Sequence, residues 1–225
     1  MSSQLKPIVL YDSEGRGPNP PRVKNLLEEL SIPYETSPVA YADVKKPEYT
    51  KINPNGRLPA IYDPNTDLTL WESGAIVLYL IERYDTSHKL SFPRGTNEAE
   101  LARQWLFFQA TGQGPYYGQA IWFNNFHPED VPSAKERYAK EIQRVTGVLE
   151  GWLAKQEVKE GGDGPWLVGG RLSYADLAFV PWQLVARGAA GQSFYDVEEF
   201  PLVKTWLERM IARESVQKAM GAMLG

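Results

Sequence analysis

The sequence predicts an α/β domain followed by an all-α domain. Two observations support this division. Proline is concentrated early in the chain, where eleven of the seventeen prolines lie within the first 95 residues. The same part carries the short apolar runs that are typical of strands, whereas the rest shows the periodicity of helices. A length of 225 residues is compatible with two domains.

The first domain is expected to begin with a strand, a helix and a second strand. Residues Ile8–Tyr11 form a short apolar run, and residues 32–39 can return as a strand. The intervening helix is indicated by apolar residues that recur on one face, namely Val23, Leu26, Leu27 and Leu30. This order predicts a parallel strand pair joined by a right-handed crossover.

A hairpin and a helix are expected to complete this domain. Leu58–Tyr62 and Leu68–Trp71 flank the turn-rich segment Asp63–Asp67, and this arrangement favours a β-hairpin. Ser73–Tyr84 then has the pattern of a helix. The predicted order is therefore βαβ, an irregular segment, and ββα.

We expect the first domain to span residues 1–86, a linker to span residues 87–95, and a helical domain to span residues 96–225. Helices of the second domain are expected at residues 97–126, 133–156, 173–187, 201–212 and 215–223. Asn97 is a candidate cap for the first of them. Glycine and proline in the segment Gly112–Pro115 should break that helix near its middle.

Composition narrows the function classes. The formal net charge of -4 argues against nucleic acid as the main partner, because phosphate binding needs a basic face. The absence of cysteine excludes a disulfide, a thiolate metal site and a thiol nucleophile within the chain. With only two histidines, a histidine zinc site is not expected, so we predict no metal. There is no apolar run of about 18 residues and no signal-peptide pattern, so a cytoplasmic location is expected.

The segment around Leu58 and Pro59 has the features of a receptor for an extended peptide. If the Leu58–Pro59 bond is cis, the backbone N–H and C=O of Leu58 face outward and can pair with a ligand as an added strand would. The alternative is an ordinary proline at a surface edge strand. Local sequence leaves both readings open.

Glu72 and Ser73 stand where the second strand of the hairpin meets the next helix. Ser73 occupies a position suited to an N-cap, and the N–H groups of Ser73 and Gly74 would favour a carboxylate. The negative charge of Glu72 would suit an ammonium group. Together they indicate a site for an amino-acid head group, although ordinary helix capping explains the same residues.

Three segments in this order resemble cytosolic glutathione transferases, namely Asn53–Ala60, Trp71–Ile76 and Leu167–Asp176. The resemblance covers nearly the whole chain. It implies a thioredoxin-like first domain and an all-helical second domain. The last segment is similar to that family's capping box, in which Ser173 and Asp176 serve each other's backbone donors.

Further segments resemble a fungal subclass of this family that is related to the globular domain of the yeast nitrogen-regulator prion protein. They are Gly17–Asn19, Trp105–Gln109 and Leu177–Trp182. The asparagine-rich tail of that protein has no counterpart in this sequence, so its prion and nitrogen-regulation roles are not carried over.

The resemblance implies that glutathione is the cosubstrate. Leu58 would pair with its cysteinyl backbone beside a cis Pro59, and Glu72 and Ser73 would hold the γ-glutamyl amine and carboxylate. Arg57 would reach the glycyl carboxylate, unless it is simply a solvated loop arginine.

One position departs from the family pattern. Relatives often carry a histidine where this sequence has Val44, so the glycyl carboxylate must be held differently. Lys45 is a possible substitute.

The residue that activates the thiol is expected in the loop after the first strand. Only a few per cent of a thiol with a pKa near 8.5 is ionised at pH 7, so the site must lower that pKa. Asn19 matches the asparagine of the fungal relatives, and its amide can donate without itself ionising. Tyr11 and Ser13 are the alternatives, and Arg16 could add positive potential. An asparagine between prolines also favours a turn by itself.

An aromatic wall for a hydrophobic second substrate is expected between the domains, at Phe108, Tyr116, Tyr117, Trp122 and Phe123. Aromatic rows at helical spacing are also typical of a core. The resemblance thus predicts a glutathione transferase that attacks a hydrophobic electrophile or a disulfide, and a homodimer. A non-catalytic glutathione-binding regulator or ligand carrier is the rival prediction.

Overall fold

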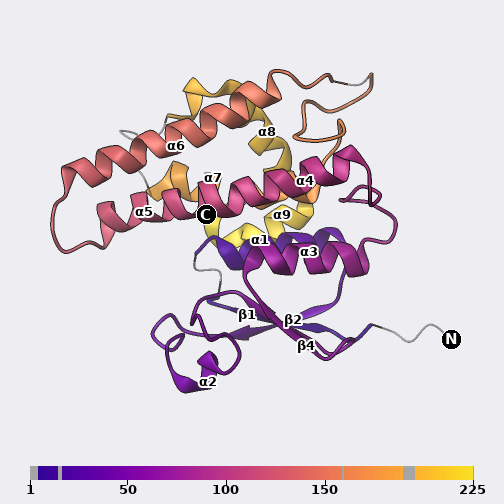
Figure 1. The fold of residues 1–225 in the computed structure, drawn as a ribbon, viewed down its shortest axis with the longest axis vertical. Coiled ribbons are helices and arrows are strands. Elements are labelled where there is room, and N and C mark those ends of the chain that lie inside the picture. Colours follow the sequence, from indigo (N-terminus) through magenta and orange to yellow (C-terminus); the bar gives the residue numbers. More distant parts are fainter. Residues whose placement is uncertain (1–4, 15–16, 159, 190–195, 225) are drawn as a thin grey trace. The chain divides into compact units, whose positions relative to one another are not determined.

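The computed structural model of the protein describes residues 5–14, 17–158, 160–189 and 196–224 (Figure 1). The chain forms two compact units. The first contains residues 1–89 together with residues 214–225, and the second contains residues 90–213. This confirms a thioredoxin-like α/β part followed by a helical part.

The first unit is built on a four-stranded mixed sheet in the order β2-β1-β3-β4. β1 (Ile8–Asp12) and β2 (Tyr34–Pro38) are parallel. β3 (Ala60–Asp63) is antiparallel to both β1 and β4 (Leu68–Trp71). The predicted crossover pair and hairpin are both confirmed.

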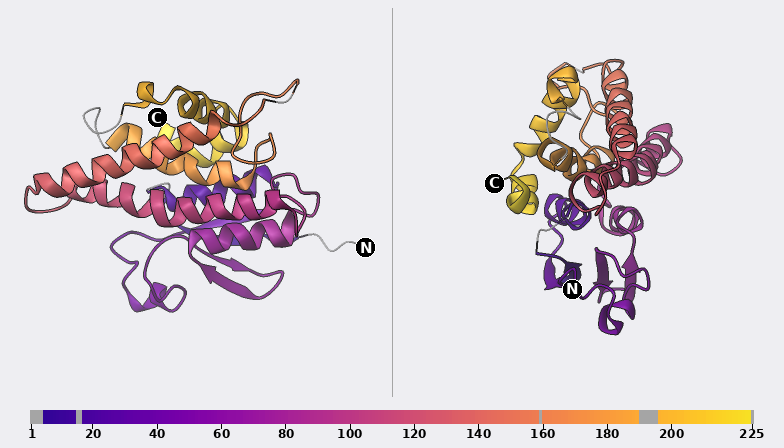
Figure 2. Two further views of the ribbon diagram at one scale, coloured as in Figure 1. Left: turned by 45° about the horizontal axis from the view of Figure 1, so that its top comes forward. Right: turned by 90° about the vertical axis from the view of Figure 1, so that its left-hand side faces the viewer.

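Helices cover both faces of this sheet (Figure 2). α1 (Asn19–Glu29) and α3 (Ser73–Tyr84) lie on one face, and the short α2 (Pro47–Thr50), within the segment expected to be irregular, lies on the other. Tyr11 packs toward the α2 face, where its ring meets that of Tyr49 edge-on at 6.1 Å. Because side chains alternate along a strand, the neighbours of Tyr11 in β1 face α1 and α3.

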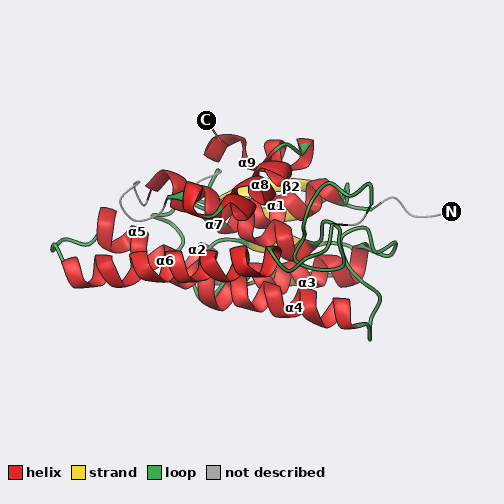
Figure 3. Ribbon diagram, turned by 90° about the horizontal axis from the view of Figure 1, so that it is seen from above, coloured by secondary structure: helices red, strands yellow, loops and turns green. Residues whose placement is uncertain are grey.

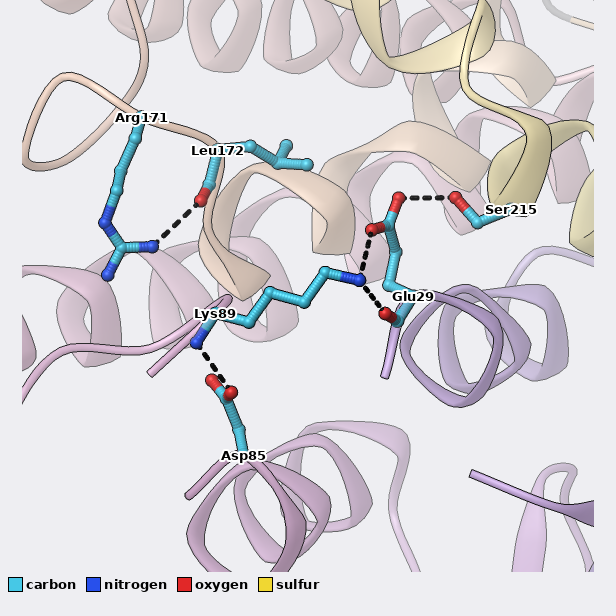
Figure 4. Close-up of polar contacts among 6 residues, drawn as sticks. All are labelled: Glu29, Asp85, Lys89, Arg171, Leu172 and Ser215. Carbon is cyan, nitrogen blue, oxygen red and sulfur yellow. Dashed lines mark hydrogen bonds and ion pairs between the residues drawn. The ribbon is translucent and has the colours of Figure 1, made fainter. Parts of the chain in front are cut away.

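The last helix, α9 (Glu214–Leu224), packs against α1 within the first unit. It buries Val216 and Met220 there. The Ser215 hydroxyl donates to the carboxylate of Glu29, which also receives the ammonium group of Lys89 at 3.6 Å (Figure 4). The sequence predicts that residues 215–223 complete the helical bundle. The structure differs because the apolar stripe and these polar contacts attach the helix to α1.

The described residues of the second unit form helices joined by loops, with no strand among them (Figure 3). Its elements are α4 (Asn97–Phe108), η1 (Gln109–Gln113), α5 (Gly114–Asn125), α6 (Pro132–Leu153), α7 (Tyr174–Ala189), η2 (Val197–Glu199) and α8 (Pro201–Ile211). The break expected near Gly112–Pro115 is the π-helical turn η1. Proline at 115 cannot donate a helical hydrogen bond, so the ladder shifts there. Thr96, rather than Asn97, caps α4 through its hydroxyl.

One buried carboxylate organises the start of α7. Asp176 accepts hydrogen bonds from the backbone N–H groups of Leu167 and Ser173, both at 2.9 Å. The Ser173 hydroxyl and the Trp206 indole also donate to it, at 2.7 and 3.0 Å. The predicted contact between the acid and the backbone of Ser173 is therefore present, whereas the Ser173 hydroxyl donates to the carboxylate of Asp176 instead of accepting from its backbone N–H. Within the described residues, no helix is both long enough and apolar enough to cross a membrane.

Candidate functional site

Three segments of the first unit meet at the candidate site. They are the start of α1, the loop at residues 53–59 and the turn between β4 and α3. α1 begins with Asn19, and the prolines that follow it occupy the first turn, where a missing N–H costs nothing. The sequence therefore places the partly buried Asn19 side chain at the beginning of α1, on the side of this helix that meets the turn between β4 and α3 through Arg22.

Arg22 links two of these segments. Its guanidinium donates from Nη1 to Ser73 Oγ at 3.0 Å and from Nη2 to Asn19 Oδ1 at 3.2 Å. The side chain is only 2% exposed, and its buried Nε has no hydrogen-bond partner among the described residues. Burial lowers the pKa of Arg22 to about 9, while the nearby carboxylate of Glu72 opposes the shift. Arg22 therefore remains a cation at neutral pH.

Sequence reasoning missed Arg22. Two signals pointed to it. It lies one helical turn after Asn19, so their side chains share a face of α1, and it lies one turn before Leu26 on the apolar side of the same helix. An arginine at this position must either point into solvent or find hydrogen-bond acceptors within the protein. The structure shows the latter, because Arg22 is buried and donates to Ser73 and Asn19.

The turn between β4 and α3 has an unusual backbone. Glu72 is the N-cap of α3 and adopts φ 70° and ψ 109°, a conformation that is costly for a residue with a Cβ. Ser73 was expected to be the cap, but it is the first helical residue and its hydroxyl accepts from Arg22. The N–H groups of Ser73 and Gly74 have no partner within the described chain, as expected at the start of a helix.

The loop before β3 presents a free backbone edge. The Leu58–Pro59 bond is cis, as one of the two readings predicted. None of the described residues hydrogen-bonds to the backbone N–H or C=O of Leu58. The carbonyl of the preceding Arg57 is fixed by the Tyr49 hydroxyl at 2.8 Å and by the Asn53 amide at 2.6 Å. The side chain of Arg57 is exposed.

Lys45 is already in contact with this loop. Its Nζ donates to the carbonyl oxygen of Asn55 at 2.7 Å, and Asn55 in turn donates to Glu72 Oε1 at 3.4 Å. Gly56, with φ 58°, passes so close to Val44 that a Cβ there would lie 2.6 Å from the Val44 carbonyl oxygen. Val44 itself is buried in the core beside α2, so it cannot replace a polar ligand-binding residue.

The three candidates for thiol activation lie in different surroundings. Asn19 shares Arg22 with Ser73 and so belongs to the hydrogen-bonded group. Tyr11 faces α2, on the other side of the sheet from α1. Ser13 is 4% exposed, and its N–H donates to Asp12. Arg16, the residue that could add positive potential according to the sequence, lies outside the described residues.

The five predicted aromatic residues do not form one wall. Tyr117 is fully buried, and its hydroxyl shares a 2.8 Å hydrogen bond with Thr146, so it belongs to the core of the second unit. Phe108 and Tyr116 are partly buried against the same core. Trp122 is 48% exposed, and Phe123 is partly exposed and stacks on neighbouring rings. Tyr117 is therefore removed from the candidate surface.

A groove of about 450 Å³ lies on the α2 face of the first unit, between the end of β2 and α2. Tyr11, Tyr49 and Ile52 are among its lining residues. It contains neither Asn19 nor the Glu72–Ser73 turn, so it is separate from the hydrogen-bonded group described above.

Comparisons with known proteins assign the family. Residues 8–82 match the family model of the glutathione S-transferase N-terminal domain, and residues 115–214 match that of the C-terminal domain. A glutathione S-transferase-like protein, gedE, of Aspergillus terreus is 63% identical over 99% of this chain and 98% of its own length. The transcriptional regulator URE2 of Saccharomyces cerevisiae is 35% identical over 96% of this chain and 69% of its own length.

A solved structure gives the same answer. The glutathione transferase URE2P6 of Phanerochaete chrysosporium, crystallised with oxidized glutathione, superposes with a TM-score of 0.87. It is 45% identical, and the match covers 100% of this chain and 99% of that one. The chain therefore belongs to the glutathione S-transferase family and is similar to its Ure2p-type members.

Proposed function

We propose that the protein is a glutathione transferase, in which the thiolate of glutathione attacks a hydrophobic electrophile or a disulfide. The observation that carries the proposal is the group formed by Glu72, Ser73, Arg22 and Asn19 next to the free backbone edge of Leu58. Each part suits a different portion of one γ-glutamyl tripeptide.

The head group of glutathione fits the turn between β4 and α3. Its γ-glutamyl carboxylate would accept from the N–H groups of Ser73 and Gly74, where the helix dipole favours an anion. Its ammonium group would meet the exposed carboxylate of Glu72. Its cysteinyl backbone would pair with Leu58 as an added strand.

The glycyl carboxylate would lie toward the loop that precedes Leu58. Arg57 is exposed there, and Lys45 already reaches this loop through the carbonyl of Asn55. Either cation can serve the carboxylate in place of the histidine that Val44 replaces. We propose that both Arg57 and Lys45 contact the glycyl carboxylate. Lys45 is the better fixed of the two, because its Nζ already donates to the carbonyl of Asn55.

The chemistry begins when the bound thiol loses its proton to solvent. A hydrogen bond from the Asn19 amide favours the thiolate, which is the nucleophile. With a carbon electrophile, the sulfur forms a C–S bond and the leaving group departs with its electron pair. With a disulfide, the sulfur forms a mixed disulfide and releases one half of the substrate as a thiolate. The thiolate of a second glutathione then attacks the glutathione sulfur of the mixed disulfide, which forms glutathione disulfide and releases the other half as a thiolate.

Aromatic residues of the second unit are the proposed contacts for the second substrate. Phe108, Tyr116, Trp122 and Phe123 keep exposed or partly exposed rings that suit an apolar molecule. Tyr117 is excluded because it is buried. A location in the cytoplasm and a homodimer also belong to this proposal, and sedimentation at micromolar concentration tests the dimer.

A second candidate function is a glutathione-binding regulator or ligand carrier with little turnover. It is favoured by the similarity to a transcriptional regulator over nearly the whole chain. Such a protein would keep the binding turn at Glu72 and Ser73 without an effective thiol activator.

Calorimetric titration with glutathione, together with two activity assays, separates these functions. The assays are conjugation of 1-chloro-2,4-dinitrobenzene and glutathione-dependent reduction of 2-hydroxyethyl disulfide. We expect wild type to bind glutathione and to turn over at least one substrate. Asn19→Ala should keep binding within about threefold and lose at least tenfold in turnover. Binding without turnover of either substrate would favour the carrier, and failure to bind glutathione would refute both functions.

A further inference from the structure

Arg22 is a buried cation whose two hydrogen-bond acceptors are neutral oxygens. We infer that Arg22 is a positioning residue that couples the two ends of the site: it supplies positive charge behind the head-group carboxylate, and it orients Asn19 toward the sulfur. This inference rests on the proposed function, because both ends are defined by glutathione. The two arms of the inference follow from the two donors of one guanidinium group.

The first arm concerns Ser73. Its Oγ accepts from Arg22 Nη1 at 3.0 Å, so its single hydroxyl hydrogen points elsewhere and can be donated to a carboxylate. The charge of Arg22 lies directly behind that hydroxyl, in a place that is 2% exposed. A buried cation with an unsatisfied Nε gains from a nearby anion. The carboxylate of the γ-glutamyl group is the anion that this site would receive.

The second arm concerns the amide of Asn19. A guanidinium has only donors, so the Asn19 atom that faces Nη2 at 3.2 Å must be the carbonyl oxygen. This contact fixes the amide in one of its two orientations and directs the N–H₂ group to the opposite side. Arg22 therefore determines which end of the Asn19 amide is presented to the glutathione sulfur, without touching the sulfur itself.

The first arm is tested by binding. The two probes are glutathione and 4-aminobutyryl-cysteinyl-glycine, which keeps the amine and lacks only the head-group carboxylate. Arg22→Met should reduce the preference of the protein for glutathione over this analogue roughly tenfold. Arg22→Lys keeps the charge and should retain most of the preference. Arg83→Met, which removes an exposed arginine from α3, is the matched control and should change nothing.

The second arm is tested by the pKa of bound glutathione, followed through the ultraviolet absorbance of the thiolate against pH. Arg22→Met should raise the thiol pKa by about one unit, as should Asn19→Ala. Because both changes disturb the same hydrogen bond, the double variant should show no larger rise than Asn19→Ala alone. Arg22→Lys should also raise this pKa, because a single ammonium cannot reproduce the fork that holds both oxygens.

The outcomes separate this inference from the function on which it rests. Wild type that binds no glutathione overturns both. If wild type binds but Arg22→Met leaves the analogue preference and the thiol pKa unchanged, only the inference on Arg22 is overturned. A general loss of folding would weaken both probes equally, so a selective loss for glutathione supports a positioning role. Additive effects of Asn19→Ala and Arg22→Met on the thiol pKa would refute the second arm.

Discussion

We expect Glu72 to lower the stability of the fold through its backbone conformation and to strengthen glutathione binding through its charge. Three substitutions at this position separate the two effects. Its φ of 70° is a conformation that costs a residue with a Cβ about 1–3 kcal/mol. Glycine avoids this cost but loses about 0.5–1 kcal/mol in backbone entropy. We therefore expect Glu72→Gly to exceed Glu72→Ala in free energy of unfolding by about 1 kcal/mol. The side chain is exposed, and its one described hydrogen bond, from Asn55, is long at 3.4 Å, so its own contribution to stability is small.

The three variants should not differ in glutathione binding as they differ in stability. Glu72→Gly, Glu72→Ala and Glu72→Gln all remove the negative charge proposed to hold the ammonium group, so each should weaken glutathione binding about tenfold. Glu72→Gln keeps the size and the backbone cost of glutamate, so its stability should match wild type. Urea unfolding and calorimetric titration measure the two effects. Glu72→Gly no more stable than Glu72→Ala would refute the argument from backbone conformation, and unchanged binding in Glu72→Gln would refute the ammonium contact.

Three further predictions concern stability, each measured by urea unfolding. Asp176→Ala leaves four buried donors without an acceptor and should cost about 3–5 kcal/mol, whereas a loss below 1 kcal/mol would contradict this account. Glu150 accepts from the first N–H groups of α8 at 3.1 and 2.9 Å, so Glu150→Ala should cost about 1 kcal/mol, as loss of a helix cap does. Burial opposes the ionisation of Asp63, but hydrogen bonds from two tyrosines and an asparagine hold its pKa below the ordinary value. Its contribution is therefore present above about pH 4 and is lost as the pH falls through the lowered pKa, and Asp63→Asn should flatten that dependence.

Much of the fold follows from local pattern. The run Ile8–Tyr11, the helical face that begins at Val23 and the turn-rich segment Asp63–Asp67 each specify their element, because hydrophobic period and turn chemistry act over a few residues. The position of α9 does not follow in this way. Its apolar stripe predicts an amphipathic helix, but any apolar surface could cover that stripe. The choice of α1 depends on contacts such as that of Lys218 with Glu28, 190 residues away in the sequence.

The candidate site shows the same limit. Leu58, Glu72 and Ser73 could be singled out in the sequence because each lies in a recognisable turn or beside a recognisable strand. Arg22 could not be found with the same ease, because arginine is rarely buried and its place depends on two acceptors from different segments. The burial of Tyr117 could not be predicted either. In the sequence, Tyr117 follows the same helical spacing as rings that are exposed, and only the packing of α5 on α6 shows which side of the helix is covered.

The arrangement of the site explains how one family can include both transferases and a regulator. In the proposed function, head-group binding would use Glu72, Ser73 and backbone groups, whereas thiol activation would belong to Asn19 at the start of α1. On this proposal, a change confined to Asn19 would remove turnover and leave the ligand bound. Arg22 limits this independence, because a single guanidinium holds Ser73 and Asn19 together. A change at Arg22 should therefore impair binding and activation at once, whereas a change at Asn19 separates them. Comparing the loss of turnover with the loss of glutathione binding in these two variants would show whether the protein works mainly as an enzyme or as a ligand carrier.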